Sequence, residues 1–138
     1  MTIQEQLTLK EDYYNEAIRY MDNAKDCLKK ANKEDGYYND RKYVKMACGT
    51  AYSGMLLALD GFLLLKGMHK PTTKDRKSIE YYQKNLTKYD QKMLNTLNGA
   101  YYILHLYGYY DGMNKATVIK EGFEEAYKII EKINPAFA

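Results

Sequence analysis

Apolar residues recur at steps of three and four along most of the chain, which is the spacing of one face of an α-helix. This pattern predicts a first helix over about residues 9–32. Thr8 and Glu11, at the start of this helix, have the spacing of a capping box, in which the two side chains bond the free amides of a helix start. A second helix is expected to begin at residue 39 or 40 and to run to residue 66, where Gly67 can adopt the left-handed conformation that closes a helix.

The capping spacing occurs twice more, as a threonine followed three residues later by an aspartate, at Thr72 and at Thr87. It predicts a short helix over about 74–86 and a longer one over about 88–110, or a single element with a kink between them. Apolar positions from Ile119 to Ile133 define a last amphipathic helix. Since no segment shows sustained period-two alternation, the sequence predicts an all-α fold: an antiparallel four- to five-helix bundle, one domain over 1–138 with an ordered core at about 9–133.

The stretch from Met46 to Leu65 is almost wholly apolar and long enough to span a membrane. Polar residues inside it favour a buried central helix in a soluble bundle instead, so no membrane contact is expected. Small residues at steps of four and three give this helix one flat face for a closely packed neighbour: Ala47, Ala51, Gly54, Ala58 and Gly61. Asp60 is the only charged residue between Met46 and Leu65 and must find a buried partner. The options are a tyrosine hydroxyl, a lysine or His105, and a catalytic carboxylate is the alternative.

Charge and cysteine content exclude several classes of function. The net charge of +3 is too small for a dedicated nucleic-acid surface, although lysines and one arginine concentrate over residues 66–92, which form a solvated helix face or a docking surface for phosphates or an acidic partner. The first residues lack the pattern of a signal peptide, so we expect a cytoplasmic protein in which Cys27 and Cys48 are reduced. Two cysteines and two distant histidines compose no zinc site, and neither a metal nor another cofactor is expected.

Residues 101–112, YYILHLYGYYDG, extend a helix that is apolar or aromatic on nearly every side. One face, which includes Leu97 and Leu104, is assigned to the core of the monomer, and a second strip carries Asn98, Tyr102, His105 and Tyr109. Such a helix is buried on more than one side, by its own bundle or by a partner. We therefore expect a homodimer with this helix at the two-fold axis, and the candidate ligand-binding or interface residues are Asn98, Tyr102, His105, Tyr109 and Asp60.

The helix order, the central segment YVKMACGTAYSGMLLALDGFLLLKG and the closing pattern YYILHLYGYYDG followed by VIKEGFEEAYKIIEKI resemble the HEPN domains (higher eukaryotes and prokaryotes nucleotide-binding), in particular a small bacterial branch. The resemblance implies the bundle fold and a nucleotide or a nucleotidyltransferase-type protein as partner. In many HEPN ribonucleases four to six residues separate an arginine from a following histidine, but residues 98–100 before His105 and 62–64 before His69 include no arginine. The leading interpretation is a non-catalytic module that acts by protein association, and the alternative is a degenerate or unconventional HEPN-type RNA-processing enzyme.

Overall fold

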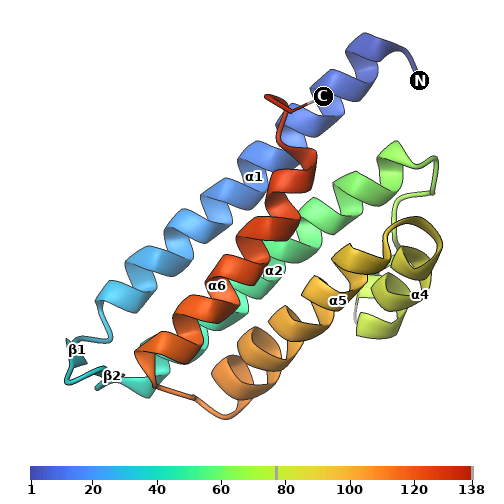
Figure 1. Ribbon diagram of the computed structural model, residues 1–138. Helices are drawn as coiled ribbons and strands as arrows, with labels where there is room; N and C mark the ends of the chain where they lie inside the picture. The colour runs from blue at the N-terminus through green and yellow to red at the C-terminus, as the bar shows by residue number, and fades with distance from the viewer. Residues whose placement is uncertain (77, 138) are drawn as a thin grey trace.

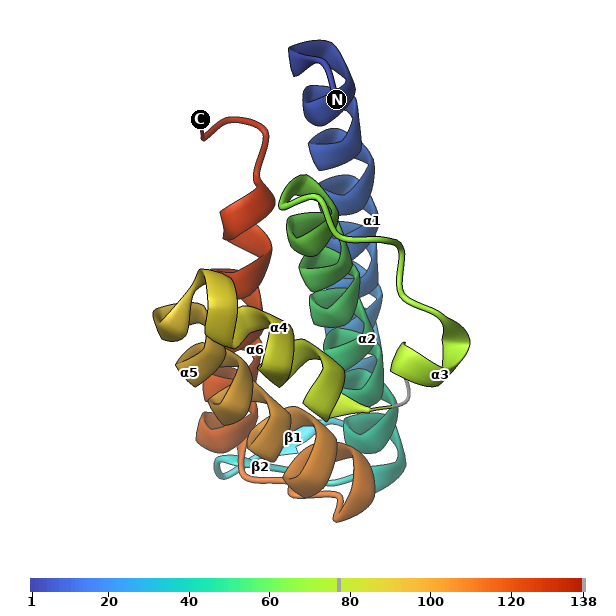
Figure 2. The same ribbon diagram turned by 90° about the vertical axis from the view of Figure 1, so that its right-hand side faces the viewer.

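The computed structural model describes residues 1–76 and 78–137, which form an antiparallel helical bundle (Figure 1). The predicted all-α class is confirmed. The elements in chain order are α1 (Ile3–Lys29), β1 (Lys33–Glu34), β2 (Tyr37–Tyr38), α2 (Arg41–Leu65), α3 (Thr73–Arg76), α4 (Ile79–Tyr89), α5 (Gln91–Ala100), the π-helix η1 (Tyr101–Tyr110), α6 (Ala116–Ile130) and the 3₁₀ turn η2 (Glu131–Ile133). The helices α1, α2, α5 with η1, and α6 run up and down the bundle, while α4 lies across it beside α2 and α5 (Figure 2).

The first helix begins earlier than the sequence analysis placed it. Thr2 and Glu5 form the capping box: the Thr2 hydroxyl accepts from the Glu5 amide at 3.0 Å, and the Glu5 carboxylate accepts from the Thr2 amide at 3.4 Å. Thr8 lies inside α1 and accepts from the Gln4 side chain. Both threonines have a glutamate three residues later, and the helix uses the earlier pair because nothing interrupts it between them.

The predicted helices over 74–86 and 88–110 have different boundaries in the structure. Thr72 and Asp75 do form a capping box, but it starts only the four residues of α3, and Ser78 caps α4 by accepting from the Glu80 amide at 3.2 Å. Thr87 lies in the last turn of α4 and donates to a backbone carbonyl. Asp90 itself is the cap of α5, so this helix begins at residue 91.

The Asp35-Gly36 turn joins two short strands that periodicity could not reveal. Asp35 and Gly36 both have positive φ, at 52° and 84°, as a two-residue hairpin turn requires. The strands pair antiparallel, with Lys33 opposite Tyr38. The hairpin is joined to the segment before α6, since the Tyr38 amide donates to the Asn114 carbonyl at 2.8 Å.

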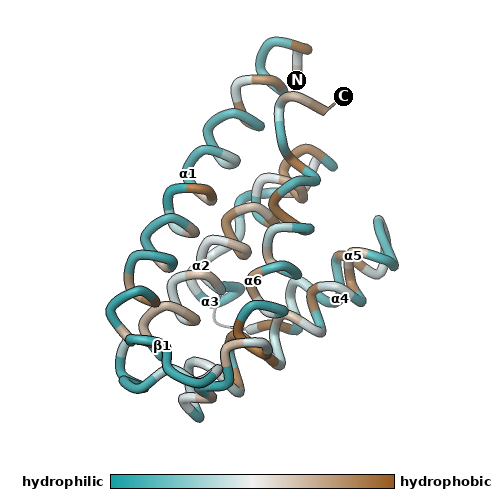
Figure 3. Tube along the Cα trace, turned by 60° about the vertical axis from the view of Figure 1, so that its left-hand side comes forward, coloured by the Kyte–Doolittle hydropathy of each residue, from teal (hydrophilic) through white to brown (hydrophobic). Residues whose placement is uncertain are grey.

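Helix α2 is the centre of the core, because it contacts α1, η1 and α6. It is long and apolar enough to span a membrane, but half of its most apolar window is buried inside the bundle, as in the core helix of a small soluble domain. The predicted flat face packs on α1: a Cβ added at Gly54 would lie 2.8 Å from the Cβ of Tyr20, and one at Gly61 would lie 2.8 Å from the Cβ of Tyr13. Helix α1, in contrast, is largely hydrophilic with hydrophobic positions at intervals (Figure 3).

Candidate functional site

Four tyrosine rings surround His105. We call these five residues the aromatic cluster: Tyr52 of α2 and Tyr101, His105, Tyr109 and Tyr110 of η1. The centroid of the imidazole lies 4.6 Å from that of Tyr52, 5.3 Å from Tyr101, 5.8 Å from Tyr109 and 4.9 Å from Tyr110. The rings of Tyr52, Tyr101 and Tyr109 are within 28° of parallel to it, whereas Tyr110 meets it edge-on at 81°. The cluster is therefore a stack of rings with one edge contact.

The π-helical form of η1 assembles this cluster. A π-helix pairs residues five apart, so residues at i+4 and i+5 both lie over residue i. Tyr109 and Tyr110 therefore both contact His105. Gly108 lets η1 approach α2, since a Cβ there would overlap the Cys48 side chain. Gly49 of α2 then lies beneath the Tyr109 ring, where a Cβ would be 2.9 Å from Cδ1.

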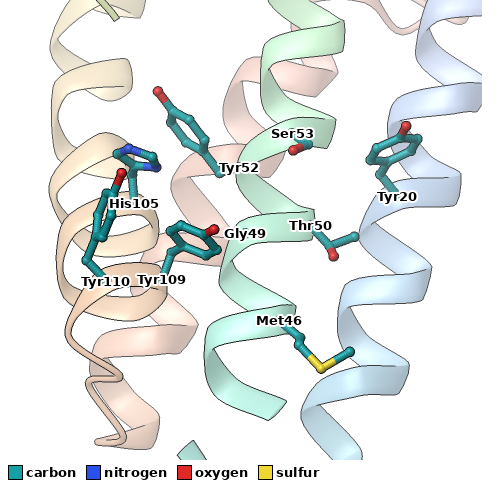
Figure 4. A pocket seen from close by; sticks show the side chains of 9 residues that line it. All are labelled: Tyr20, Met46, Gly49, Thr50, Tyr52, Ser53, His105, Tyr109 and Tyr110. Carbon is teal, nitrogen blue, oxygen red and sulfur yellow. The ribbon is translucent and has the colours of Figure 1, made fainter. Parts of the chain in front are cut away.

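The aromatic cluster borders two hollows that meet at Tyr52 and His105. The first, of about 550 Å³, has α2 as its floor and lies between the rings of η1 and Tyr20 of α1 (Figure 4). Side chains of Thr50 and Ser53 add hydroxyl groups to it, and among the described residues that line it none is charged. The second, of about 380 Å³, contains the ion-forming side chains of Arg76 and Glu80. The site is thus an aromatic groove that is neutral along one half and carries one charge of each sign along the other.

Partial burial sets the protonation states in this groove. Loss of water around His105 lowers the pKa of its imidazole, so this side chain is neutral at pH 7. Burial raises the pKa of the Tyr52 hydroxyl, which stays protonated. The neighbouring Cys48 is fully buried, and burial raises the pKa of its thiol to about 12, which makes it a poor nucleophile. The groove therefore offers ring faces and neutral hydrogen-bonding groups.

Asp60 lies in the interior and is 2% exposed. It contacts one polar side chain from each of two other helices. Its carboxylate accepts from the Tyr82 hydroxyl of α4 at 2.8 Å and lies 3.4 Å from the Arg76 guanidinium of α3. Burial raises the pKa of Asp60, while the Tyr82 bond and the charge of Arg76 act in the opposite direction. A tyrosine partner was among the options from the sequence. The ionic partner is Arg76, and an arginine was not among those options.

Comparison with known protein families and solved structures shows which family this chain belongs to. A family described as "Domain of unknown function (DUF5618)" matches residues 12–135. The chain belongs to this family. A solved structure of a protein of unknown function from Dyadobacter fermentans is similar to this DUF5618 member, with 43% sequence identity over 94% of this chain and 98% of that one, and a TM-score of 0.79. No curated protein matches the sequence.

In this DUF5618 domain, the residues singled out from sequence fall into separate places. His105 and Tyr109 lie together in the aromatic cluster. Tyr102 is 53% exposed on the outer side of η1. Asn98 accepts a hydrogen bond from Gln83 of α4 at 2.8 Å, and Asp60 is hydrogen-bonded to Tyr82 in the interior. The ligand-binding and interface roles of these residues stay predictions.

Three members of the groove were missed or misplaced. At 100° per residue, Tyr110 is about 140° from His105 on an α-helix, and only the wider π-helical turn brings the two rings together. Tyr52 is only 9% exposed, and nothing in the sequence indicates that its ring contacts His105. Arg76 joins the groove from α3, and no local pattern signals that approach. Ile103 of η1 packs against Gly122 of α6, on the side of η1 away from the groove.

Proposed function

We propose that this DUF5618 domain is a non-catalytic module that acts by protein association, and that a second copy of the chain binds across η1. The observation that carries the proposal is the exposure of aromatic side chains on this one element. Tyr102, Tyr107, Tyr109 and Tyr110 are 44–60% exposed. Tyrosine supplies large rigid area at low entropic cost, and its hydroxyl can bond a partner or water at the edge of an interface.

The charge pattern favours a second copy over other occupants. No Asp, Glu, Lys or Arg occurs from Met93 to Tyr110, although 28% of the chain is charged. A two-fold contact places a residue at the axis near its own copy, so a charge there would meet a like charge. His105 is neutral at pH 7 because burial lowers its pKa, and it adds no charge to this surface. An uncharged aromatic face therefore suits self-association.

We assign the module to the HEPN-like fold family on the sequence resemblance. Its support is the order of helices and the small residues of the central helix, which together favour that fold family. A nucleotide or a nucleotidyltransferase-type protein as a further partner depends on this assignment. Thermal unfolding with a panel of nucleotides tests the nucleotide directly, because a ligand of the folded state raises the apparent melting temperature.

Analytical sedimentation at micromolar concentration tests the homodimer. We expect a dimer for the wild type, and monomers that keep the helical circular dichroism spectrum for Tyr102→Arg and Leu106→Arg, because a two-fold contact would bring the new charges together. Tyr89→Arg is the matched control, since Tyr89 is 41% exposed at the end of α4 and outside η1. A monomeric wild type contradicts the proposal, as does a dimer that Tyr89→Arg splits equally well.

One observation favours the alternative of an RNA-processing enzyme. Arg76 and His105 line the same hollow, so the structure supplies from α3 an arginine that the positions before His105 lack. The ion pair of Arg76 with Asp60 opposes this role, because it already neutralises the guanidinium. For this reason we expect no cleavage of an RNA panel in the presence of a chelator. Cleavage that both His105→Ala and Arg76→Ala abolish would establish the alternative.

A further inference from the structure

We propose that the protein binds a short chain of phosphoryl groups in a lysine-lined cleft at the hairpin end of the bundle. The cleft consists of two adjoining hollows of about 370 and 360 Å³ that share Lys25, Leu28, Lys33 and Tyr38. Its walls are the end of α1, the β1–β2 hairpin and the first half of α6, which lie together at one end of the molecule (Figure 1). The described residues that line it include none of the aromatic cluster, so this site is separate from the surface on η1.

Positive charge is concentrated in this cleft. Among the described residues that line it, Glu124 is the one acid and four are lysines: Lys25, Lys29, Lys33 and Lys120. Their excess of three positive charges is as large as the net charge of the whole chain. Asp26 lies 4.0 Å from Lys29, but both side chains are more than 70% exposed, and an ion pair in water neutralises little of the field.

The cleft is formed before any ligand arrives. The ammonium group of Lys25 lies 4.8 Å from the centre of the Tyr127 ring, and its interaction with the Tyr127 side chain contributes most to a raised pKa, so this lysine stays charged. The backbone that carries Lys33 is held in the hairpin, because the Ala116 amide of α6 donates to the Gly36 carbonyl at 2.9 Å. Fixed positions reduce the entropy lost on binding.

The chemistry of the walls selects the ligand. Lysine ammonium groups act as point charges on phosphoryl oxygens, and no described arginine, whose planar fork binds carboxylates and phosphates in two-bond contacts, lines the cleft. Four ammonium groups on three elements require a ligand with several negative charges spread along its length. Leu28 and Phe123 add apolar surface to the cleft between the lysines. An oligophosphate meets these requirements, either free or esterified to a nucleoside.

Isothermal titration of the full chain with sodium tripolyphosphate tests the site. We expect saturable binding to the wild type, and a Kd raised about tenfold or more in the double variant Lys33→Gln, Lys120→Gln, since two charge-assisted contacts are lost. The matched control is Lys84→Gln, Lys88→Gln, which removes the same charge from exposed positions of α4. This control is expected to bind as the wild type does.

Further titrations distinguish the two sources of the phosphoryl chain. A nucleoside triphosphate that binds as tightly as tripolyphosphate indicates a free oligophosphate, and one that binds at least tenfold more tightly indicates a nucleotide. Both results support the site. Absence of saturable binding at millimolar tripolyphosphate overturns the proposal. Equal weakening in the cleft and control variants also overturns it, because binding would then reflect net charge alone.

Discussion

On two sides of helix α2, glycines lie against tyrosines of a neighbouring helix, but the two contacts differ in burial. Toward α1, Gly54 and Gly61 face the Cβ atoms of Tyr20 and Tyr13, so the helix backbones lie close together and the contact is part of the interior. Toward η1, Gly49 faces the ring of Tyr109, which remains 45% exposed. The same pair of residue types builds the core in one place and a groove in the other.

The difference lies in which part of the tyrosine touches the glycine. A Cβ atom is fixed to the backbone, so a group placed against it can be accommodated only if a helix moves. A ring is carried on two rotatable bonds and can turn toward water at modest cost. Glycine therefore marks a close approach in both places, but among these three glycines of α2 only the two at the α1 contact face a fixed Cβ atom.

The largest effect we expect follows from this rigidity. Gly54→Leu should lower the free energy of unfolding by about 3 kcal/mol, the upper end of the cost of overpacking a core. Even its Cβ would lie 2.8 Å from the Cβ of Tyr20 and 3.2 Å from the carbonyl oxygen of Ala17, and neither atom can move without α1. Urea denaturation followed by circular dichroism measures the change.

Two variants complete this test. Gly49→Leu should cost no more than about 1 kcal/mol, because Tyr109 can turn outward and the helix gains about 1 kcal/mol from losing a glycine. Gly99→Ala has open space, with the nearest side-chain atom 4.0 Å away, and should stabilise the protein by about 1 kcal/mol. Equal losses for Gly49→Leu and Gly54→Leu would show that both sides of α2 are equally rigid.

A second, smaller effect on stability concerns the buried hydrogen bond between Tyr82 and Asp60. Asp60→Leu should lower the free energy of unfolding by about 1 to 3 kcal/mol, because the buried Tyr82 hydroxyl loses its acceptor. Tyr82→Phe removes the donor and leaves Asp60 with Arg76, so a smaller loss is expected. An unchanged or raised melting temperature for Asp60→Leu would mean that the pair contributes nothing to the stability of the fold.

The sequence predicted those features that depend on one helix at a time. The bundle class, the close of α2 at Gly67, with its positive φ of 89°, and the flat face of α2 all follow from local spacing or the backbone freedom of glycine. Helix starts were less predictable, because Thr2 and Thr8 both have the capping spacing and the choice between them depends on how far the helix extends.

The groove was less accessible to prediction than the fold, because it depends on contacts between elements. Periodicity assumes 3.6 residues per turn, and the π-helical turns of η1 change which residues share a face. Arg76 reaches Asp60 through tertiary packing, across sixteen positions of sequence. Sequence reasoning therefore located His105 and Tyr109 correctly as neighbours, but could not find Tyr52, Tyr110 and Arg76 around them.

The smallest effect we expect is a pH dependence of stability that arises from His105. It tests whether the ring stack is half-buried or fully solvated. Partial burial lowers the pKa of His105, so the folded state binds a proton less readily than the unfolded state, whose histidine titrates near about 6.5. The stabilisation linked to neutral His105 is therefore complete above that pH and is lost as the pH falls through the lowered value. The rings of the aromatic cluster face this imidazole, and Arg76 and Glu80 line the adjoining hollow.

His105→Phe keeps an aromatic ring in the stack and removes the titrating group, so it isolates this contribution. Between pH 7.5 and pH 5, we expect the free energy of unfolding to fall more in the wild type than in His105→Phe, with all other titrating groups common to both proteins. Urea denaturation at the two pH values measures the difference. Identical losses would mean that His105 is as well solvated in the folded protein as in the unfolded chain, and the η1 side of α2 would then be an open surface instead of a groove.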